Sequence, residues 1–420
     1  MNLPVVNPHC CALDLHKKSI VACLLSTDAE GRVHKQIRTF GTFTRDLRAL
    51  QRWLQEHGVT HVAMESTGVL WKSLFNLFEG LFDLQLVNAQ HVKQVPGRKS
   101  DVRDCEWLAV LLRHGLLGKS NVPERWQREL RELTRYRTSL VEEHSAELNR
   151  IEKTLEGAGI KLAAVVSTLA TQSARDMLEQ LAAGESDPEK LADLARGRLR
   201  QKLADLELAL EGQMGAHQRF LLRQQLDHLV SLEGFIAALS AEIAQRLAPH
   251  EAVLQLLETI PGVGRRIAEQ LVAEIGLDMS RYPTDGHLVS WAAMCPGQHE
   301  SGGKKKRAPV RKGNRWLRST LIEAARAAAR TKASYSEAQY RRLAARRGSR
   351  RAAVAVGHSI LVASYHVIRE GVPYQELGGQ YYDERDRDGV TRRSVKRLEA
   401  LGYEVTLRVR EVGAAEPVAA

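Results

Sequence analysis

Short apolar runs and helix-like segments alternate along the first 120 residues, and this alternation limits the possible folds more than any other feature. Two apolar runs, around Leu13 and over residues 20–25, precede a glycine turn and a third strand candidate, RVHKQIRTF. TRDLRALQRWLQEHG then has apolar residues at helical spacing and stops at Gly58, a residue type that often ends helices. Strand, helix, strand and helix follow in VTHVAMESTG, VLWKSLFNLFEGL, DLQLVNAQHV and DVRDCEWLAVLLRHGLL. Three strands before such an alternation predict an α/β layered domain.

Leucine-rich, helix-like sequence fills the middle of the chain, from Pro123 to about His250. One run there has apolar residues at steps of three and four: Leu222, Leu226, Leu229, Leu232, Ile236, Leu239, Ile243 and Leu247. This spacing predicts a long helical hairpin or a coiled coil. The helices could pair within one chain as a plain bundle, or the apolar seam could bind a partner helix, which the seam's length favours.

A third region opens with LLETIPGVGRRIAEQLVAEIG, which predicts a helix, a glycine-rich turn and a second helix. Glycines at a helix start leave backbone N–H groups exposed at the positive end of the helix dipole, where a phosphate is favoured. The motif resembles a helix-hairpin-helix, which clamps the DNA backbone, with Gly262 and Gly264 as the phosphate-binding residues. The alternative is a tight turn between two helices inside a core.

Positive charge is concentrated in residues 301–351. This segment holds 17 Lys and Arg against two acids, Glu323 and Glu337, so it nets +15 and the remainder nets −4 of the total +11. Such a concentration is typical of proteins that bind a polyanion. Interleaved apolar residues such as Trp316 and Leu321 favour a packed surface over a disordered tail. Nucleic acid is the expected partner, and a solvated helix face is the alternative.

Composition disfavours several other classes of protein. No apolar run reaches the roughly 18 residues that span a bilayer, and MNLPVVNPHCC lacks the charged and apolar regions of a secretory signal. The five cysteines form no CxxC pair, so we expect buried free thiols rather than a disulfide framework or a zinc site. We expect a cytoplasmic protein without membrane contact.

Four carboxylates stand out in the first region. Asp14 interrupts the first apolar strand and Glu65 ends the fourth, where an unpaired carboxylate is costly. Asp101 and Asp104 lie three residues apart at the start of a helix, so they share one face. Mg²⁺ accepts a few carboxylates together with water and phosphate oxygens, and Mn²⁺ is the alternative ion. We expect all four acids to bind metal and to act in catalysis at phosphorus, although Asp101 alone would suit a helix cap and Asp104 alone the surface.

The basic segment adjoins CPGQHESGGKKKRAPVRKGNRWLR, residues 295–318. Ser301 precedes Gly302 and Gly303, which would let the backbone approach DNA closely. Three cations that would neutralise a phosphate come next: Lys304, Lys305 and Lys306. The residues alone leave Ser301 as a turn residue, part of a phosphate nest or a nucleophile. Five further residues are expected to contact phosphate or RNA: Arg311, Lys312, Asn314, Arg315 and Arg318.

Taken in order, these motifs resemble one family. ALDLHKKS, MESTG and KSDVRDCEWLA give an Asp-Glu-Asp-Asp set similar to that of RuvC-type Holliday-junction resolvases, which have a ribonuclease-H-like fold. Followed by IPGVG and CPG…SGGK…RKGNRWLR, they resemble the bacterial insertion-sequence transposases usually called IS one-ten. The resemblance covers about residues 8–165 and 250–385; residues 165–220 are longer than the usual connection, and the tail beyond about 385 matches nothing in the family.

The resemblance implies a recombinase that excises and inserts its element as double-stranded DNA at the bacterial nucleoid. The four acids would bind Mg²⁺, and Ser301 would attack the DNA phosphate and hold it covalently. A structured non-coding guide RNA would pair with target and donor DNA. Because recombination of two duplexes needs several cleavage sites, we expect a homodimer or homotetramer in which Ser301 of one chain meets the acids of another. The alternatives are a metal-dependent junction nuclease, in which Ser301 only cradles phosphate, and a non-catalytic nucleic-acid-binding scaffold.

The expected organisation has four parts. They are an α/β RuvC-like domain over residues 1–122, a helical coiled-coil arm over 123–250, a mainly α-helical C-terminal serine transposase domain with the helix-hairpin-helix-like element over 251–385, and a tail of unknown role over 386–420.

Overall fold

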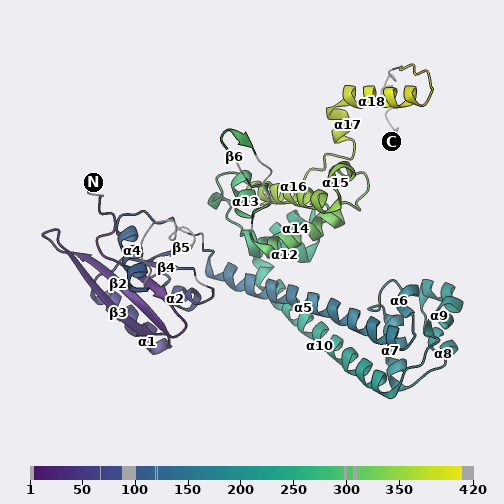
Figure 1. Cartoon of the computed structure of the whole chain (residues 1–420), viewed down its shortest axis with the longest axis horizontal. Helices are drawn as coiled ribbons and strands as arrows, with labels where there is room; N and C mark the ends of the chain where they lie inside the picture. Colours follow the sequence, from purple (N-terminus) through teal and green to yellow (C-terminus); the bar gives the residue numbers. More distant parts are fainter. Residues whose placement is uncertain are drawn as a thin grey trace, which may run out of the picture. The chain divides into compact units, whose positions relative to one another are not determined.

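The structure is a computed structural model of the 420-residue chain. It describes residues 4–66, 68–87, 101–118, 120, 122–297, 300–305, 310–311 and 313–408, and at residues 101–103, 301 and 305 it describes the backbone alone. The chain forms two compact units, Met1–Arg125 and Trp126–Ala420. The first unit is a mixed sheet with helices, and the second is mostly helical (Figure 1).

The described part of the first unit contains five strands and three helices. In chain order these are β1 (Cys10–Leu15), β2 (Ser19–Thr27), β3 (Val33–Gly41), α1 (Thr44–Glu56), β4 (His61–Glu65), α2 (Trp71–Phe78), β5 (Asp83–Val87) and α4 (Asp101–Arg113). The strands lie in the order β3-β2-β1-β4-β5. The first three pair antiparallel, whereas β4 pairs parallel with both β1 and β5. Within the described residues the predicted order of strands and helices is therefore confirmed, and residues 88–92 of the last predicted strand lie outside them.

Alternation along β1 sends its side chains into two different cores. Leu13 packs in the core formed with α1 and α2, which includes Leu50 and Phe78. Ala12 packs instead in the core that contains Cys105 of α4. Helices α1 and α2 thus cover one face of the sheet and α4 covers the other (Figure 1).

Helices make up nearly all of the second unit. In chain order its elements are α5 (Arg125–Gly157), α6 (Leu162–Val165), α7 (Gln172–Ala183), α8 (Pro188–Ala192), η1 (Gly197–Lys202), α9 (Leu203–Leu210), α10 (Ala216–Leu247), η2 (Ala248–His250), α11 (Glu251–Glu258), α12 (Arg265–Ile275), η3 (Met279–Arg281), α13 (Asp285–Trp291), β6 (Glu300–Ser301), β7 (Lys304–Lys305), α14 (Arg315–Ala328), α15 (Tyr335–Arg347), α16 (Ser349–Glu370), α17 (Tyr381–Arg385) and α18 (Arg387–Ala400).

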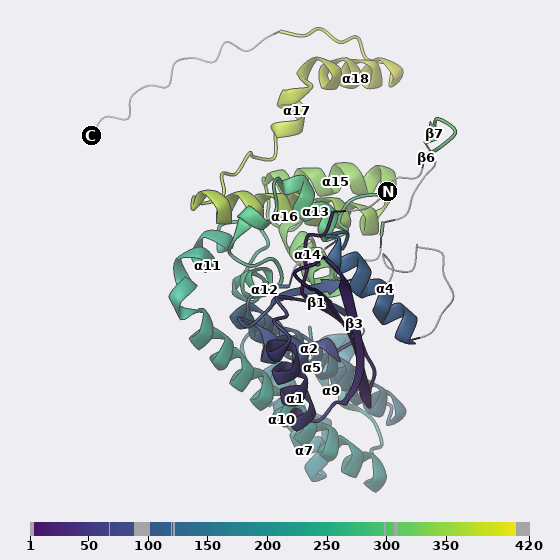
Figure 2. The ribbon, with the colours of Figure 1, turned by 90° about the vertical axis from the view of Figure 1, so that its left-hand side faces the viewer.

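α5 and α10 lie side by side as an antiparallel arm, with α6–α9 at its far end (Figures 1 and 2). Near one end of the arm Arg246 donates to Glu129 at 3.0 Å, and near the other Thr154 donates to Gln225 at 3.1 Å. The start of α5 therefore lies beside the end of α10, and the end of α5 lies beside the start of α10. At about 1.5 Å per residue, the 33-residue α5 is about 50 Å long.

Most of the apolar seam predicted on α10 is buried within this single chain. Leu222, Leu226 and Leu229 pack with α5 and α7 at the far end of the arm, and Ile243 and Leu247 pack in the core at its base. The seam residues of the middle, Ile236 and Leu239, are half-buried. The plain intramolecular bundle is therefore the arrangement found, and the seam gives no argument for a partner helix.

The remaining helices surround the largest core of the second unit, and α16 runs through it. α16 is the one helix in the described part of the chain that is long and apolar enough to span a membrane, with a mean hydropathy of 1.3 over its most apolar window. Val356, Ile360 and Leu361 of this helix are buried in the core. Core packing accounts for its apolar character.

Candidate active site and nucleic-acid interface

Asp14 is the next-to-last residue of β1 and Glu65 is the last residue of β4, and these two strands are parallel neighbours. β1 and β4 pair Leu13 with Met64, so the next pair in the same register is Asp14 and Glu65. By alternation, both acids belong to the face of the sheet that carries Ala12, which α4 covers. Both residues are half-buried, and the Asp14 side chain is 18% exposed. Two carboxylates thus share one face at one end of the sheet.

α4 begins at Asp101 and carries the other two acids. One helical turn after Asp101, the Cys105 thiol donates to the carbonyl of Ala12 at 3.2 Å. This hydrogen bond holds the first turns of α4 over β1, two residues before Asp14. Asp104 is exposed, and the side chain of Asp101 lies outside what the structure describes. The backbone therefore brings the start of α4 towards the strand ends that hold the first two acids.

The donor set suits a divalent cation of the Mg²⁺ type, because it consists of carboxylates, which Mg²⁺ accepts together with water and phosphate oxygens. Within the described side chains, which exclude Asp101, no group of three or more acids, histidines or cysteines is close enough to hold an ion. Asp14 is oriented by His16, whose Nε2 lies 3.2 Å from its Oδ2. His16 was not among the predicted site residues, although its position two residues after Asp14 places it on the same face of an extended strand.

The cysteines of the first unit are free and buried, as predicted: Cys10, Cys11, Cys23 and Cys105. Burial raises the pKa of the Cys10 thiol to about 12 and that of the Cys23 thiol to about 11. Burial also raises the pKa of Cys105, and the nearby Asp14 carboxylate acts in the same direction. These thiols stay protonated at neutral pH and serve as packing groups rather than as nucleophiles.

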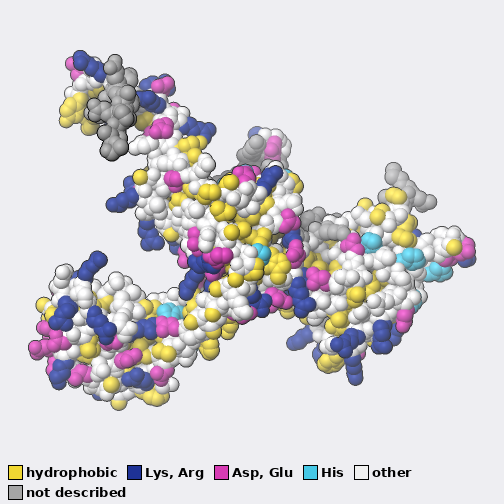
Figure 3. All heavy atoms as spheres, turned by 180° about the vertical axis from the view of Figure 1, so that it is seen from behind, with side chains coloured by type: hydrophobic (Ala, Val, Ile, Leu, Met, Phe, Trp, Pro, Cys, Tyr) yellow, Lys and Arg dark blue, Asp and Glu magenta, His cyan; other side chains and the backbone are white. Residues whose placement is uncertain are grey.

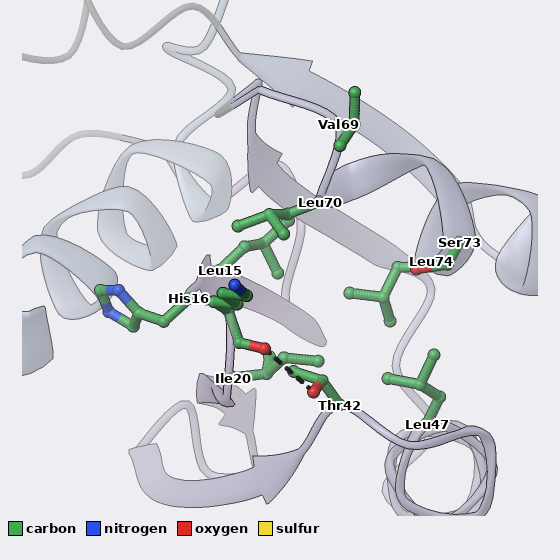
Figure 4. A pocket seen from close by; sticks show the side chains of 10 residues that line it. Leu15, His16, Ile20, Thr42, Leu47, Val69, Leu70, Ser73 and Leu74 are labelled. Carbon is green, nitrogen blue, oxygen red and sulfur yellow. Dashed lines mark hydrogen bonds between the residues drawn. The ribbon is translucent and has the colours of Figure 1, made fainter.

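A pocket of about 240 Å³ opens beside the carboxyl end of β1. Leu15 and Leu74 point into it, whereas the imidazole of His16 points away (Figure 4). At its edge the Thr42 hydroxyl donates to the carbonyl of Lys17 at 3.2 Å. Leu15 follows Asp14 in the strand, so its side chain points to the opposite face. The pocket therefore lies on the face of β1 opposite the acids.

Ser301 lies in a two-stranded hairpin, not in an irregular loop. β6 and β7 pair Glu300 with Lys305 and Ser301 with Lys304. Gly302 and Gly303 form the two-residue turn between them, with φ of +59° and +73°. Two successive positive φ values are the signature of a type I′ hairpin turn, which glycine adopts without strain. The turn of the β6–β7 hairpin, seen in Figure 2, explains the glycines, and Ser301 is the last residue of β6, directly before it.

The base of this hairpin segment is fixed by side chains that were expected to contact nucleic acid. An isolated bridge pairs Pro296 with Val310. Arg318 donates to the carbonyl of Ala293 at 3.0 Å and to that of Arg311 at 2.7 Å, so it ties together the two flanks of the hairpin. The Arg311 guanidinium in turn donates to Ser290, to its hydroxyl at 2.7 Å and its carbonyl at 3.2 Å.

Asn314 caps a helix rather than projecting to solvent. Its Oδ1 accepts hydrogen bonds from the backbone N–H groups of Trp316 and Leu317 at the start of α14. Its Nδ2 donates to the buried Glu274 at 2.5 Å, a carboxylate that also accepts two bonds from Arg135. Every polar atom of the Asn314 amide therefore has a structural partner.

Two other residues that were predicted to contact nucleic acid are exposed. The Arg315 guanidinium lies 4.5 Å from the ring centroid of Trp316, and Arg315 is exposed. Lys304 is exposed at the hairpin. Lys306 and Lys312 lie outside the described residues, as does the side chain of Lys305.

The predicted helix, glycine turn and helix are present as α11, the turn and α12, but the two glycines differ. A Cβ on Gly262, whose φ is +83°, would lie 2.3 Å from the carbonyl oxygen of Ala324 in α14. Gly262 is therefore required by packing, which matches the alternative of a tight turn within a core. Gly264 is the exposed N-cap of α12, and no described atom lies within 4 Å of a Cβ placed there. The next residue, Arg265, is held by Glu251 at 2.5 Å.

Comparison with known proteins gives the family. A transposase profile of the Asp-Glu-Asp-Asp type, DEDD_Tnp_IS110, matches residues 11–160, and the profile of the transposase IS116/IS110/IS902 family matches residues 254–341. The chain belongs to the IS116/IS110/IS902 transposase family. This is the family that the sequence motifs indicated, and it makes the protein a DNA transposase. Residues 161–253 and those after 341 lie outside both profiles.

Relatives of this transposase include a "Probable family 20 transposase" from Pseudomonas aeruginosa. It is 28% identical over 282 residues, which cover 67% of this chain and 74% of the relative. The pilin gene-inverting proteins of Moraxella bovis and Moraxella lacunata are each 29% identical over 124 residues, 29% of this chain and 38% of the relative. The chain thus matches less than half the length of the two Moraxella proteins.

Proposed function

We propose that this transposase cuts and rejoins the DNA of a bacterial insertion sequence in the cytoplasm through a covalent serine–phosphate intermediate. The Ser301 hydroxyl would attack the scissile phosphate and the P–O bond to one deoxyribose would break. The released deoxyribose oxygen would take up a proton in exchange for the one that the serine loses. Rejoining reverses these steps with a different deoxyribose hydroxyl. The observation that carries the proposal is the hairpin, because a type I′ turn places Ser301 next to the tip and pairs it with Lys304. A cation opposite a nucleophile stabilises the charge that develops on phosphorus.

Trapping the adduct tests the nucleophile directly. End-labelled element DNA incubated with the active chain and then denatured should give a protein-bound product, and Ser301→Ala should abolish it. Ser319→Ala is the matched control, because Ser319 is an exposed serine on α14 in the same basic segment. Cleavage by the Ser301→Ala chain without any adduct would instead establish the metal-dependent nuclease.

The four acids are proposed to hold Mg²⁺, or Mn²⁺ in its place: Asp14, Glu65, Asp101 and Asp104. The ion would supply charge neutralisation at the reacting phosphate. The protein's own part is to hold the acids at one end of a ribonuclease-H-like, RuvC-like sheet. Support comes from the register that pairs Leu13 with Met64, the residues just before Asp14 and Glu65, and from the thiol hydrogen bond that fixes α4 over β1.

Asp104→Ala should abolish cleavage and leave DNA binding almost unchanged, because removing a negative charge beside a phosphate does not weaken electrostatic attraction. Glu106→Gln on the same helix is the matched control; its carboxylate is paired with Lys35 at 2.9 Å. Mn²⁺ binding measured by calorimetry on the free protein should weaken for Asp104→Ala and not for Glu106→Gln. Recombination at the wild-type level by Asp104→Ala would remove this acid from the mechanism.

We also propose that the protein works as a homodimer or homotetramer with a structured guide RNA. Joining two duplexes needs more than one Ser301, and the acids and the serine belong to different compact units of the chain. Mixing an Asp14→Ala chain with a Ser301→Ala chain tests whether copies share their catalytic residues. Partial return of the adduct supports sharing, and its absence shows that each copy is self-contained.

The guide RNA is tested by sequencing the RNA that copurifies with the protein and by repeating the cleavage assay after ribonuclease treatment.

A further inference from the structure

The end of the chain forms a helix that neither family profile includes. α18, Arg387–Ala400, begins well beyond residue 341, where the second profile ends. Four of its five cations recur at intervals that place them on one side of a helix: Arg392, Arg393, Lys396 and Arg397. Val395, Leu398 and Leu401 fall away from this side, whereas Val390 lies beside Arg397. α18 is therefore a basic helix.

Local interactions define this helix without help from a core. At its C-terminus Gly402 has φ of +90°, and the N–H of Tyr403 donates to the carbonyl of Leu398 at 3.1 Å. The N–H of Gly402 donates to Glu399 at 2.9 Å. These two bonds across a left-handed glycine form a Schellman motif, which ends helices in a sequence-encoded way. The helix is thus specified by its own residues.

Packing within the chain does not explain why α18 exists. Within this helix, which the structure describes from end to end, the one buried residue is Gly389, at its first turn. Leu398 is 42% exposed and Leu401 is 68% exposed, and the cationic residues 392, 393, 396 and 397 are all exposed. On the side of the molecule seen in Figure 3, dark-blue Lys and Arg side chains and yellow hydrophobic ones both reach the surface of this terminal part. Such a surface fits an external partner.

The segment before α18 is anchored beside α15, which belongs to the basic segment. Tyr382 of α17 stacks on Tyr335 at 5.3 Å between ring centroids and donates its hydroxyl to that of Tyr335 at 2.7 Å. The Arg342 guanidinium lies 5.4 Å from the Tyr382 ring centroid. α15 itself exposes further cations, including Arg346 and Arg347. The tail therefore leaves the second unit next to an existing positive surface.

We propose that the basic face of α18 binds the phosphate backbone of duplex DNA and extends the DNA-binding surface beyond the family's own domains. The helix holds five cations against two acids, Asp388 and Glu399, so it is net positive, and DNA is the polyanion on which a transposase acts. Residues four apart on a helix are about 6 Å apart along its axis, a spacing that lets successive side chains reach successive phosphates. Asp386 pairs with Arg393 at 3.0 Å, which leaves Arg392, Lys396 and Arg397 for phosphate. Binding is independent of sequence, because it involves the backbone and not the bases.

The test is the salt dependence of binding to duplex DNA, measured on the full chain without divalent ions so that cleavage does not occur. Arg392→Gln, Lys396→Gln and Arg397→Gln combined should lower the slope of log affinity against log salt by about 0.9 for each phosphate that is no longer neutralised, about 2.7 for three. Arg392→Lys with Arg397→Lys keeps the charges and should keep the slope. The matched control removes three exposed cations from α1: Arg45→Gln, Arg48→Gln and Arg52→Gln.

An unchanged slope in the α18 triple variant overturns the proposal, and so does an equal fall in the α1 control, which would reflect net charge alone. The triple variant can also be tested on phosphatidylglycerol vesicles. If it no longer binds them while its salt slope on DNA stays at the wild-type value, the helix binds a membrane surface instead of DNA. Because the assay contains no cleavage step, failure here leaves the proposed chemistry of Ser301 untouched, and failure of the adduct experiment leaves the role of α18 untouched.

Discussion

Replacing Gly262 with alanine is expected to destabilise the second unit, because the position combines two constraints. Its φ of +83° lies in the left-handed region, and a Cβ there would lie 2.3 Å from the carbonyl oxygen of Ala324 and 2.6 Å from the amide nitrogen of Ala328. Both of these atoms belong to the backbone of α14, so no side-chain rotation can relieve the overlap. The turn would have to move away from α14.

The cost follows from these two contributions. A left-handed conformation costs a residue with a Cβ about 1–2 kcal/mol relative to glycine, and forcing an extra methyl group into a packed site costs about 1–3 kcal/mol. Together they give a destabilisation of about 2–5 kcal/mol. At about 2–4 °C of melting temperature per kcal/mol for a large domain, the transition should fall by several degrees or more.

Calorimetric melting of the full chain measures this effect, with Gly264→Ser as the matched control two residues away. Gly264 has φ of −94° at an N-cap with open space around it, where serine is at least as favourable as glycine. The control should melt at or slightly above the wild-type temperature. A Gly262→Ala chain that melts like the wild type but binds DNA more weakly would refute the packing argument and restore the phosphate-binding role.

Three further predictions concern neighbouring features. Asn314→Ala should destabilise the second unit by about 2–4 kcal/mol in thermal melts: about 1 kcal/mol for the missing N-cap and about 1–3 kcal/mol for the donor removed from buried Glu274. The salt slope of DNA binding should not change, and a changed slope would mean that the amide reaches DNA. Neutralising Lys304, Lys305 and Lys306 together should reduce that slope by about 0.9 for each phosphate they bind, whereas an unchanged slope would place this basic segment away from DNA. A thiol reagent at neutral pH should label the half-buried Cys295 before the four buried cysteines, as mass spectrometry of the modified peptides can show; labelling of Cys105 first would contradict its burial and raised pKa.

The fold of the first unit could be predicted because its signals are local. Short apolar runs indicated the strands, and Gly58, with φ of +62°, follows the C-cap of α1 as its sequence position indicated. That Asp14 and Glu65 lie near each other could be suspected because both belong to apolar strands. Their neighbouring positions follow from the parallel register of β1 and β4, which pairs Leu13 with Met64, 51 residues apart in sequence, and leaves no local trace.

The second unit was harder to predict because distant residues decide the roles of its polar groups. The position of Asn314 within a basic segment suggested that it binds phosphate, but its partner Glu274 lies 40 residues earlier. Gly262 likewise meets α14, and no local pattern encodes that approach. The spacing of the seam on α10 indicated a helix, yet periodicity alone cannot tell an intramolecular partner such as α5 from a second chain.

Variants of Arg315 and Arg318 can distinguish two roles of the basic segment, positioning the hairpin and binding DNA. Arg318 uses its guanidinium for the carbonyls of Ala293 and Arg311, one on each flank of the segment that carries Ser301. Arg318→Ala should therefore lower the yield of the covalent adduct by loosening the base of the hairpin, with the salt slope of DNA binding unchanged. Arg315 is exposed and has only a ring contact with Trp316 among its described neighbours, so Arg315→Ala should reduce the slope by about 0.9 if this side chain neutralises one phosphate. Measuring adduct yield and slope for both variants distinguishes the two roles. A reduced slope for Arg318→Ala, with the adduct formed at the wild-type level, would show that Arg318 binds DNA and that the hairpin holds its place without it.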